Sequence, residues 1–380
     1  MMKEFYDIAV VPGDGIGPEV IDATLMVLEE ALAGRSPLKY SHYPAGAEHF
    51  METGDSLPVE TFEACQRADA ILHGAAGLPG VVHPDGTEAG LDFTLKLRRE
   101  FDLYANVRPI QLQAGVRSPL ADVENIDYVI VRENSEGLYL ARGAGVQVGS
   151  DFAVDSLVQT RKGIERVVRF SFELARSRNG APKDGIRRVT CCDKANVLQS
   201  YAFFRKIFDE VALEYPDIES EHCLVDAMTV HLVLRPDHYD VIVSENMFGD
   251  IISDLGAATI GGLGMAPSSE IGADSALFQA SHGSAPDIAG KGLANPYATI
   301  LAACGMLDWL GHRYDDQYLV DKSTVIKDSV SAVFRSPENL SADLGGDKGT
   351  VQIRDAILSE IRKYNSGPLE SNDFKARVNA

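Results

Sequence analysis

The chain has 380 residues, of which 45% are hydrophobic and 24% are charged, which is typical of a soluble globular protein long enough for two domains. Its formal net charge of −21 argues against binding to nucleic acid or to an acidic membrane, so an anionic substrate would need a local cluster of arginines. The five cysteines are scattered, and neither a signal peptide nor a long apolar run is present, which predicts a cytoplasmic protein without disulfides.

Strand-like and helix-like segments alternate along the first third of the chain, which predicts an α/β fold. Residues 8–11 form the first predicted strand, and the turn Gly13–Gly17 leads into a helix to about residue 33, with Pro18 at its start. The glycines of this turn do not match the dinucleotide-binding fingerprint, so we do not predict a Rossmann site. The next elements are predicted at 68–74 (strand), 88–100 (helix) and 103–112 (strand).

The alternation continues through the rest of the chain, and no low-complexity linker marks a domain boundary. Residues 140–160 are rich in glycine and then alternate, which indicates an irregular segment or a β-hairpin. The polar tail from about Asn365 is expected to fray. Strands are predicted at 128–131, 188–192, 221–225 and 239–243, and helices at 162–177, 198–214, 226–235, 248–258, 297–310, 321–334 and 349–363.

Asp250 and Asp254 follow a short apolar strand and lie four residues apart, on one face of a predicted helix. Two carboxylates so placed repel each other unless a cation compensates, and aspartate oxygens suit Mg²⁺ or Mn²⁺. A solvated helix face, with Asp250 favoured by the helix dipole, also explains the pair. Taken alone, the pair favours this second interpretation.

Three arginines lie near the ends of predicted strands and helices, where α/β sheets place their ligands. They are Arg98, Arg108 and Arg132. Together they could hold a dicarboxylate through bidentate contacts, although each alone is more often part of a surface ion pair.

Three more polar side chains follow predicted strands. Tyr139 lies in a glycine-containing loop and could be a half-buried aromatic, whereas Lys194 directly follows a strand, which is unusual for a solvated lysine. Asp226 follows the next strand and could be a helix cap.

Seven segments, in order along nearly the whole chain, resemble the β-decarboxylating dehydrogenase family. That family includes 3-isopropylmalate, isocitrate, homoisocitrate, tartrate and D-malate dehydrogenases. The segments are 13–19 (GDGIGPE), 102–109 (DLYANVRP), 132–139 (RENSEGLY), 193–197 (DKANV), 244–254 (SENMFGDIISD), 282–291 (HGSAPDIAGK) and 343–346 (DLGG).

The resemblance implies a two-domain α/β fold with a central mixed β-sheet, which is not a Rossmann fold. The first, cofactor-side domain would be discontinuous, formed by residues 1–102 and 265–380. Residues 103–264 would form the second domain, which carries the substrate site, the metal site and the dimer contacts, with an arm at about 140–160. The family is at least dimeric, so a homodimer or tetramer is expected, with Lys194 and Asp226 entering each active site from the neighbouring subunit.

The resemblance also implies oxidative β-decarboxylation of a 2-hydroxy dicarboxylic acid. Mg²⁺ or Mn²⁺ would bind Asp250 and Asp254, plus Asp226 of the other chain, and would chelate the substrate. Lys194 would take the hydroxyl proton, and Tyr139 would protonate C3 after CO₂ leaves. The substrate carboxylate would be held by Arg98, Arg108 and Arg132.

The resemblance places the cofactor at residues 282–295. Gly283, Ser284 and Ala285 would pass close to the adenosine, and His282 and Asn295 would contact the adenine end. Ile288 would also belong to the cofactor-binding residues. Asp287 falls where the family binds the adenosine ribose, and a carboxylate there repels a 2′-phosphate, which predicts NAD rather than NADP.

The helix before Arg98 sets substrate choice in the family, and Thr94 and Leu95 occupy the positions of the two leucines of isopropylmalate enzymes. Asp92 would repel a third carboxylate, which disfavours isocitrate and homoisocitrate. Thr94 weakens a pure isopropyl pocket, so tartrate and D-malate remain alternatives to a 3-isopropylmalate-like substrate. A further departure is Gln279-Ala-Ser281, where the family usually has Glu-Pro-Val.

Two hypotheses of other classes compete with an active dehydrogenase. A non-catalytic regulatory homologue would typically lose metal or base residues, which are present here. A phosphate-binding or hydrolytic protein lacks support, because no P-loop or nucleophile–base arrangement is found.

Overall fold

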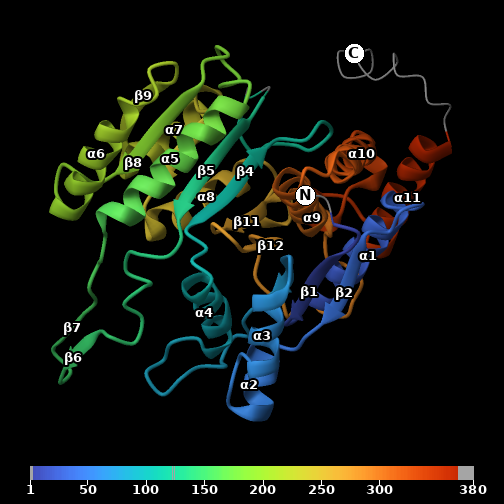
Figure 1. Ribbon diagram of the computed structural model, residues 1–380, viewed down its shortest axis with the longest axis horizontal. Coiled ribbons are helices and arrows are strands. Elements are labelled where there is room, and N and C mark those ends of the chain that lie inside the picture. The colour runs from blue at the N-terminus through green and yellow to red at the C-terminus, as the bar shows by residue number, and fades with distance from the viewer. Residues whose placement is uncertain (1–2, 122, 124, 367–380) are drawn as a thin grey trace.

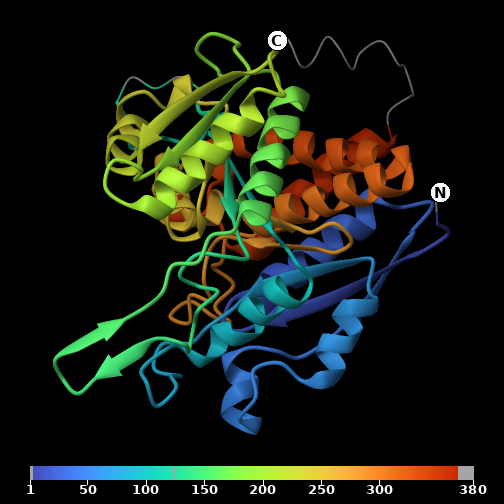
Figure 2. The same ribbon diagram turned by 60° about the vertical axis from the view of Figure 1, so that its left-hand side comes forward.

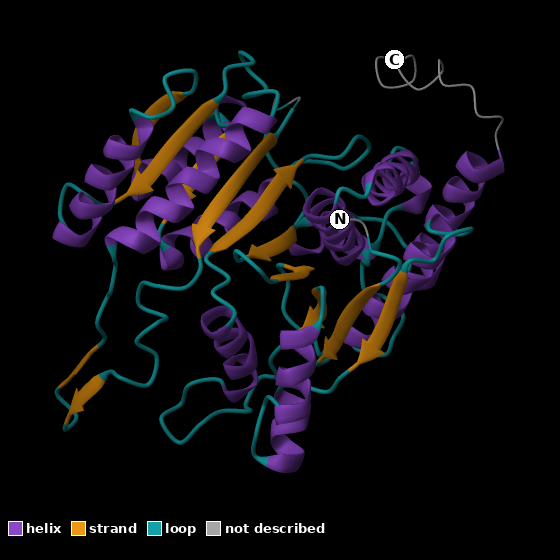
Figure 3. Ribbon diagram, viewed as in Figure 1, coloured by secondary structure: helices purple, strands orange, loops and turns teal. Residues whose placement is uncertain are grey.

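The computed structural model describes residues 3–121, 123 and 125–366 (Figure 1). Within these residues, ten strands form one central sheet with helices on both of its faces (Figure 3). In sheet order the strands are β2 (Leu38–His42), β1 (Tyr6–Gly13), β3 (Ala70–Ala75), β12 (Ala276–Ala280), β11 (Pro267–Ile271), β4 (Ala105–Gln111), β5 (Asp127–Glu133), β10 (Val241–Ser244), β8 (Arg188–Asp193) and β9 (Glu219–Leu224). The expected α/β class is therefore confirmed.

The sheet is mixed, as expected. The strands from β2 to β12 are parallel, and so are those from β5 to β9. Between these two groups, β11 and β4 pair antiparallel with each other and with their outer neighbours. Two antiparallel strands at the centre distinguish this sheet from the parallel sheet of a Rossmann fold.

Eleven α-helices are present in the described residues, and most of them cross between parallel strands. Helices α1, α9, α10 and α11 pack together, α5 and α6 pack against the β5–β8 part of the sheet, and α7 packs on α8 (Figure 1). Their bounds are α1 (Gly17–Ala31), α2 (Ala47–Thr53), α3 (Val59–Arg67), α4 (Asp92–Glu100), α5 (Arg161–Ser177), α6 (Gln199–Ala212), α7 (Val225–Leu234), α8 (Asn246–Thr259), α9 (Tyr297–Tyr314), α10 (Gln317–Phe334) and α11 (Thr350–Ser366).

Helix α5 shows how the sequence pattern produces this packing. Thr160 caps its first turn by accepting a hydrogen bond from the Gly163 amide at 3.0 Å. Apolar side chains then recur every three or four residues, and Ile164, Val168 and Phe172 are buried against the sheet. Replacing a buried phenylalanine such as Phe172 by alanine costs about 3–5 kcal/mol, so this face fixes the helix.

The division into two domains, residues 1–102 with 265–380 and residues 103–264, remains a prediction. The sheet runs continuously across them, and the largest hydrophobic core takes residues from both sides. Leu72 and Phe278 contribute from the predicted first domain, and Ile130 and Ile242 contribute from the second.

The hairpin expected within residues 140–160 is confirmed. Strands β6 (Val146–Val148) and β7 (Phe152–Val154) pair antiparallel in a sheet of their own. Figure 2 shows the hairpin projecting away from the body of the molecule. Its apolar side chains are exposed, including Val146 and Phe152.

Five strands and helices were not expected from the sequence pattern, namely β2, α2, α3, β11 and β12. All other predicted strands and helices are confirmed, with bounds that differ by a few residues. The tail expected to fray lies, from residue 367 on, outside the described residues. Across the described ranges, every helix is too short or too polar to cross a membrane.

Candidate active site

Asp250 and Asp254 lie on α8, whose first turn is capped by Glu245 accepting a hydrogen bond from the Phe248 amide at 2.9 Å. The expected shared face is found, because Arg108 reaches both carboxylates. Its Nη2 lies 3.1 Å from Asp250 Oδ1, and its Nη1 lies 3.4 Å from Asp254 Oδ1. Nearby cations therefore compensate part of the repulsion between the two aspartates.

Arg108 and Arg132 come from the neighbouring antiparallel strands β4 and β5, so both point toward α8. Arg132 pairs with Asp250, and its Nε and Nη2 donate to Asn246 Oδ1 at 3.0 and 2.8 Å. Burial, only partly offset by Asp250, lowers the pKa of Arg132. Although burial opposes ionisation of Asp250, the Arg132 and Arg108 guanidinium groups hold its pKa below the usual value.

Asp254 is the more accessible of the two aspartates, with 54% of its side chain exposed against 33% for Asp250. Burial raises its pKa, and the neighbouring Asp250 carboxylate adds to this effect. Among the described residues its one ion pair is with Arg108 at 3.4 Å, so its oxygens are open to a further positive group.

Arg98 on α4 is held by Glu270 of β11, a carboxylate that the sequence analysis did not single out. Arg98 Nε lies 3.0 Å from both Glu270 oxygens, and Nη2 lies 2.5 Å from Oε1. Glu270 is only 1% exposed. Burial opposes its ionisation, but Arg98, together with Arg132 and the hydrogen bond from Asn134, lowers its pKa. Two of the three nitrogens of Arg98 are thus engaged by protein.

Glu270 is the centre of a buried polar network that spans the sheet. It accepts hydrogen bonds from Asn106 at 3.2 Å, Asn134 at 3.2 Å and Gln279 at 2.8 Å. The side-chain amide oxygen Oδ1 of Asn106 accepts a hydrogen bond from Arg108 Nε at 3.0 Å, so the network connects Arg98 to Arg108.

The far end of this network is His73 on β3, in the middle of a fully buried strand. Its Nδ1 lies 2.8 Å from Gln279 Oε1, so it donates to the amide oxygen while the amide nitrogen donates to Glu270. Burial lowers the pKa of His73 to about 4. Gln279, noted in the sequence as a departure from the family pattern, therefore joins a neutral histidine to a buried carboxylate.

Tyr139 lies beside the same carboxylate as the arginines. Its hydroxyl donates to Asp250 Oδ2 at 3.3 Å, and its ring lies 5.4 Å from the Arg132 guanidinium. Burial, helped by the charge of Asp250, raises the pKa of Tyr139. The phenol therefore keeps its proton at neutral pH, as a proton donor must.

Lys194 and Asp226 pair with each other, with Nζ 2.8 Å from Oδ1. This pair follows β8 and β9, and the lysine lowers the pKa of Asp226. Within the described part of one chain, no three aspartate, glutamate, histidine or cysteine side chains lie close enough to hold a metal ion. Asp226 therefore does not join Asp250 and Asp254 in the same chain.

The predicted cofactor segment packs against the turn before α1. The Ile16 amide donates to the Ser284 carbonyl at 2.8 Å, and the Ser284 hydroxyl donates to the Gly77 carbonyl. A side chain at Gly15 would lie 2.1 Å from the Ser284 carbonyl oxygen, so glycine is needed there. Ala285 has a positive φ of 39°, an uncommon conformation that is often found at ligand sites.

The side chains of this segment differ in what they can offer to a ligand. His282 Nε2 is buried and has no hydrogen-bond partner among the residues that the structure describes, and burial lowers the pKa of this residue. Asp287 is exposed and Ile288 is partly buried. Asn295 is 6% exposed, accepts from the Tyr297 amide at 3.1 Å and donates to Asp343 at 3.3 Å, so it holds the start of α9.

A pocket beside α4 brings several predicted residues together. It is lined by Leu95, Arg98 and Tyr139, and also by Asp92 and Arg142. Thr94 is not part of this lining. It is 7% exposed, and its hydroxyl donates to the Leu91 carbonyl at 2.9 Å. Arg142 was not considered in the sequence analysis because nothing in its local sequence marks it.

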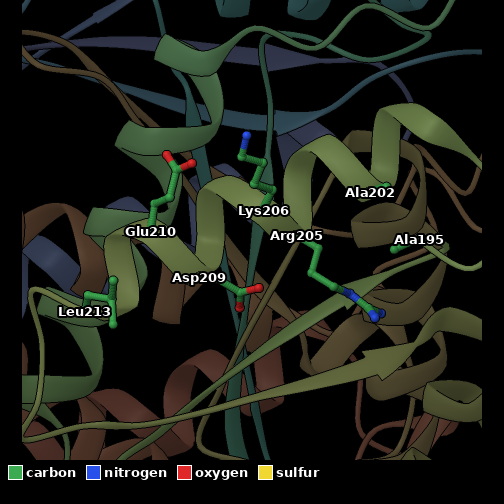
Figure 4. Close-up of a pocket in the computed structure, with 7 residues that line it drawn as sticks. All are labelled: Ala195, Ala202, Arg205, Lys206, Asp209, Glu210 and Leu213. Carbon is green, nitrogen blue, oxygen red and sulfur yellow. The ribbon is translucent and has the colours of Figure 1, made fainter.

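A second, open pocket runs along α6 (Figure 4). Lys206 and Glu210 point to one side of the helix there, whereas Arg205 and Asp209 point to the other (Figure 4). Arg205 is occupied by Asp193 at 2.7 Å. This pocket contains none of the predicted site residues.

The residues present fit a divalent cation and a dinucleotide. Asp250 and Asp254 offer hard oxygen donors on one helix face, with Asp254 only loosely paired. At the cofactor segment, Gly283 has open space where a side chain would stand, and His282 has an unsatisfied buried nitrogen.

This fold and this grouping of arginines and aspartates define an α/β enzyme for a small anionic substrate. The chain belongs to the isocitrate/isopropylmalate dehydrogenase family, whose sequence model matches residues 7–357. It is accordingly a decarboxylating dehydrogenase that acts on a hydroxy acid.

Its similarity to individual proteins extends over almost the whole chain. It is 43% identical over 359 residues to a 3-isopropylmalate/3-methylmalate dehydrogenase of Methanocaldococcus jannaschii, covering 94% of this chain and 99% of the relative. It is 40% identical over 376 residues to the homoisocitrate dehydrogenase of the same organism, covering 97% and 100%. Among solved structures, an isocitrate dehydrogenase from Methylococcus capsulatus superposes with a TM-score of 0.84 at 36% identity, covering 94% of this chain and 100% of the other.

Proposed function

We propose that the protein catalyses NAD- and divalent-metal-dependent oxidation and β-decarboxylation of a 3-substituted malate. The observation that carries this proposal is the arrangement around Asp250. Two arginines and the Tyr139 hydroxyl converge on this carboxylate, and Asp254 lies one helical turn away. A site for a cation and a site for a substrate carboxylate thus share one surface.

The residues of this chain have distinct roles in the proposed reaction. A bound cation would polarise the C2 oxygen of the substrate, and NAD would accept a hydride. Asp250 and Asp254 would hold the cation, which leaves Arg108 and Arg132 to orient the carboxylate that departs as CO₂. Tyr139 would then protonate C3.

Lys194 and Asp226 would act in the active site of a second copy of the chain, with Lys194 as the base for the hydroxyl proton. Exposed apolar side chains on α7, α8 and the β6–β7 hairpin support a homodimer, because patches of this kind mark protein–protein contacts. They include Val230, Val233 and Leu234 on α7, Ile251 on α8, and Val146, Val148, Phe152 and Val154 on the hairpin.

The substrate is proposed from the curated relatives. Several are 3-isopropylmalate dehydrogenases at 40% identity or more, which makes a 3-isopropylmalate-like acid the first candidate. Thr94 no longer supports tartrate or D-malate as the substrate, because its hydroxyl donates a hydrogen bond to the backbone of its own helix. A regulatory homologue is disfavoured because the metal, base and acid candidates are all present.

NAD is proposed over NADP because Asp287 is an exposed carboxylate at the predicted ribose position. The test of the function is NADH formation with Mn²⁺, using a panel of 3-isopropylmalate, D-malate, tartrate, isocitrate and homoisocitrate. We expect turnover of a 3-substituted acid, its loss with a chelator, and a higher kcat/KM with NAD than with NADP. Silence across the whole panel would contradict the proposal, and a preference for NADP would contradict its cofactor part.

A further inference from the structure

Lys194 lies in a turn that its own side chain cannot hold in place. Strands β8 and β9 end side by side, so Lys194 and Asp226 meet just beyond their ends. Lys194 Nζ lies 2.8 Å from Asp226 Oδ1, but 25% of the lysine side chain and 65% of the aspartate side chain are exposed. An exposed ion pair of this kind stabilises a given geometry only weakly, so the position of Lys194 depends on the backbone of the turn.

The turn is held by Asp193, the last residue of β8, whose side chain is fully buried. Asp193 Oδ1 accepts a hydrogen bond from the Ala195 amide at 2.9 Å, which closes a short turn around Lys194. Beyond this turn, the Val197 and Leu198 amides both donate to the Lys194 carbonyl at 3.1 Å. The backbone that carries Lys194 thus depends on the orientation of one buried carboxylate.

Arg205 on α6 sets the orientation of this carboxylate. Its Nε lies 2.8 Å from Asp193 Oδ2 and its Nη2 lies 2.7 Å from Oδ1, a double contact that suits the planar guanidinium group. Figure 4 shows Arg205 extending from α6 toward the side on which Ala195 lies. Across the described part of the chain, this is the one ion pair that Asp193 forms. A buried carboxylate that loses its cation is strongly destabilised, so the turn would rearrange without Arg205.

We propose that Arg205 is a positioning residue for the proposed reaction. Through Asp193 it holds the turn from which Lys194 reaches the substrate, although its own side chain lines the open pocket along α6. Because Lys194 acts in the site of a second copy, Arg205 of one chain serves the site built around Asp250 of the other. This inference rests on the proposed function, since it needs Lys194 as the base and its exchange between two copies.

The first test separates kcat from KM, with NAD, Mn²⁺ and the acid of the panel that the unmodified protein turns over fastest. Arg205→Leu should lower kcat at least about 10-fold, because Lys194 is displaced, and should change the KM of the acid and of NAD by less than about threefold. Arg205→Lys should recover part of kcat, because lysine keeps the charge but loses the planar fork. Arg169→Leu is the matched control, since it removes an arginine that pairs with Glu214 at the surface, and should leave kcat within about twofold.

The second test uses mixed dimers and gives a result that a general loss of stability would not give. Paired with Asp250→Asn, Arg205→Leu should recover about half of the unmodified activity per dimer, since one site takes Asp250 from one chain and Lys194 with its intact Arg205 from the other. Paired with Lys194→Ala, Arg205→Leu should stay at least about fivefold lower than this, because neither site receives a correctly placed lysine.

The outcomes separate this inference from the reaction itself. An unchanged kcat in Arg205→Leu, or equal activity of the two mixed dimers, overturns the role of Arg205 and leaves the proposed reaction standing. If Arg205→Leu does not fold, Arg205→Lys decides: a lowered kcat at an unchanged KM supports the role, and an unchanged kcat overturns it. Lack of turnover with every acid overturns the proposed function, and this inference with it.

Discussion

At the scale of single residues, the site is a balance of three arginines against three carboxylates. Arg98 is held by Glu270, whereas Arg108 and Arg132 share Asp250, and Arg108 also reaches Asp254. Asp250 and Asp254 are partly exposed and can bind a cation, whereas Glu270 is buried and remains paired with Arg98. The ion pair with Glu270 therefore fixes the position of Arg98. Arg108 and Arg132 would be available to a substrate carboxylate once a cation binds the two aspartates.

The first prediction concerns the amide of Gln279, which donates to Glu270. Gln279→Glu would set two buried carboxylates against each other, so one would keep a proton and the hold on Arg98 would weaken. We expect a loss of about 2 kcal/mol in the free energy of unfolding at neutral pH, measured by urea denaturation, and a higher KM.

Combining Gln279→Glu with Glu270→Gln restores one amide and one carboxylate. The double variant should be more stable than the sum of the single changes by at least about 1 kcal/mol. Gln317→Glu is the matched control, since it sets a glutamate beside Asp321 on the exposed face of α10 and should cost under about 0.5 kcal/mol. Additive single effects would show that the two positions are not coupled.

The second prediction concerns His73. Its pKa is about 4 in the folded chain against 6.5 for an ordinary histidine. Between these values the unfolded chain binds a proton that the folded chain does not, so stability falls as the pH falls through this window. We expect about 3 kcal/mol of this loss to disappear in His73→Leu, measured by urea denaturation from pH 7 to pH 4. His312→Leu, on the exposed last turn of α9, is the matched control for the loss of an imidazole. This explanation would be ruled out if the difference in stability between His73→Leu and the unmodified protein were the same at every pH.

Residue types and spacing indicate part of this site, but only long-range contacts define the rest. Asp250 and Asp254 are found together because four residues on a helix bring them to one face. Glu270 and Arg98 are 172 residues apart in sequence, and their strand and helix meet only in the folded sheet. Nothing in the local pattern around Arg142 places it beside Asp92 in the pocket, for the same reason.

At the scale of elements, the difference between local sequence patterns and long-range contacts also explains which strands and helices could be predicted. Helix α5 has a regular apolar face and a threonine cap, and β5 has a continuous apolar run, so both were expected. Strand β11 begins with a proline and places the charged Glu270 in the core, which breaks any apolar pattern. In the edge strand β2 only Leu38 is buried, so its sequence shows little alternation.

The third prediction concerns the β6–β7 hairpin, whose side chains are exposed although several are apolar. Phe152→Asp would place a charge on this surface, which should weaken association of two copies if the hairpin lies between them. We expect a shift from dimer to monomer in analytical ultracentrifugation, with an unchanged circular dichroism spectrum. Leu213→Asp, at an exposed leucine that directly follows α6, is the control and should leave the dimer intact. A dimer that persists in Phe152→Asp would remove the hairpin from the interface.

At the scale of the whole molecule, the acidic and basic groups that we propose for the reaction lie in two separate places on one chain. The Asp250 cluster lies on α8, and the Lys194–Asp226 pair is separate from it. If two copies exchange these groups, each complete site takes Asp250 from one chain and Lys194 from the other. A monomer would then lack a complete site, although its fold is intact.

Mixed dimers test this division directly. Lys194→Ala and Asp250→Asn should each inactivate the homodimer, because every site lacks one group. In a dimer with one chain of each kind, one site carries both changes and the other carries neither. Mixed dimers purified through two different tags should therefore regain about half of the unmodified activity per dimer. Mixed dimers as inactive as their parents would show instead that Lys194 serves the Asp250 of its own chain, and the separation of these groups within one chain would need another explanation.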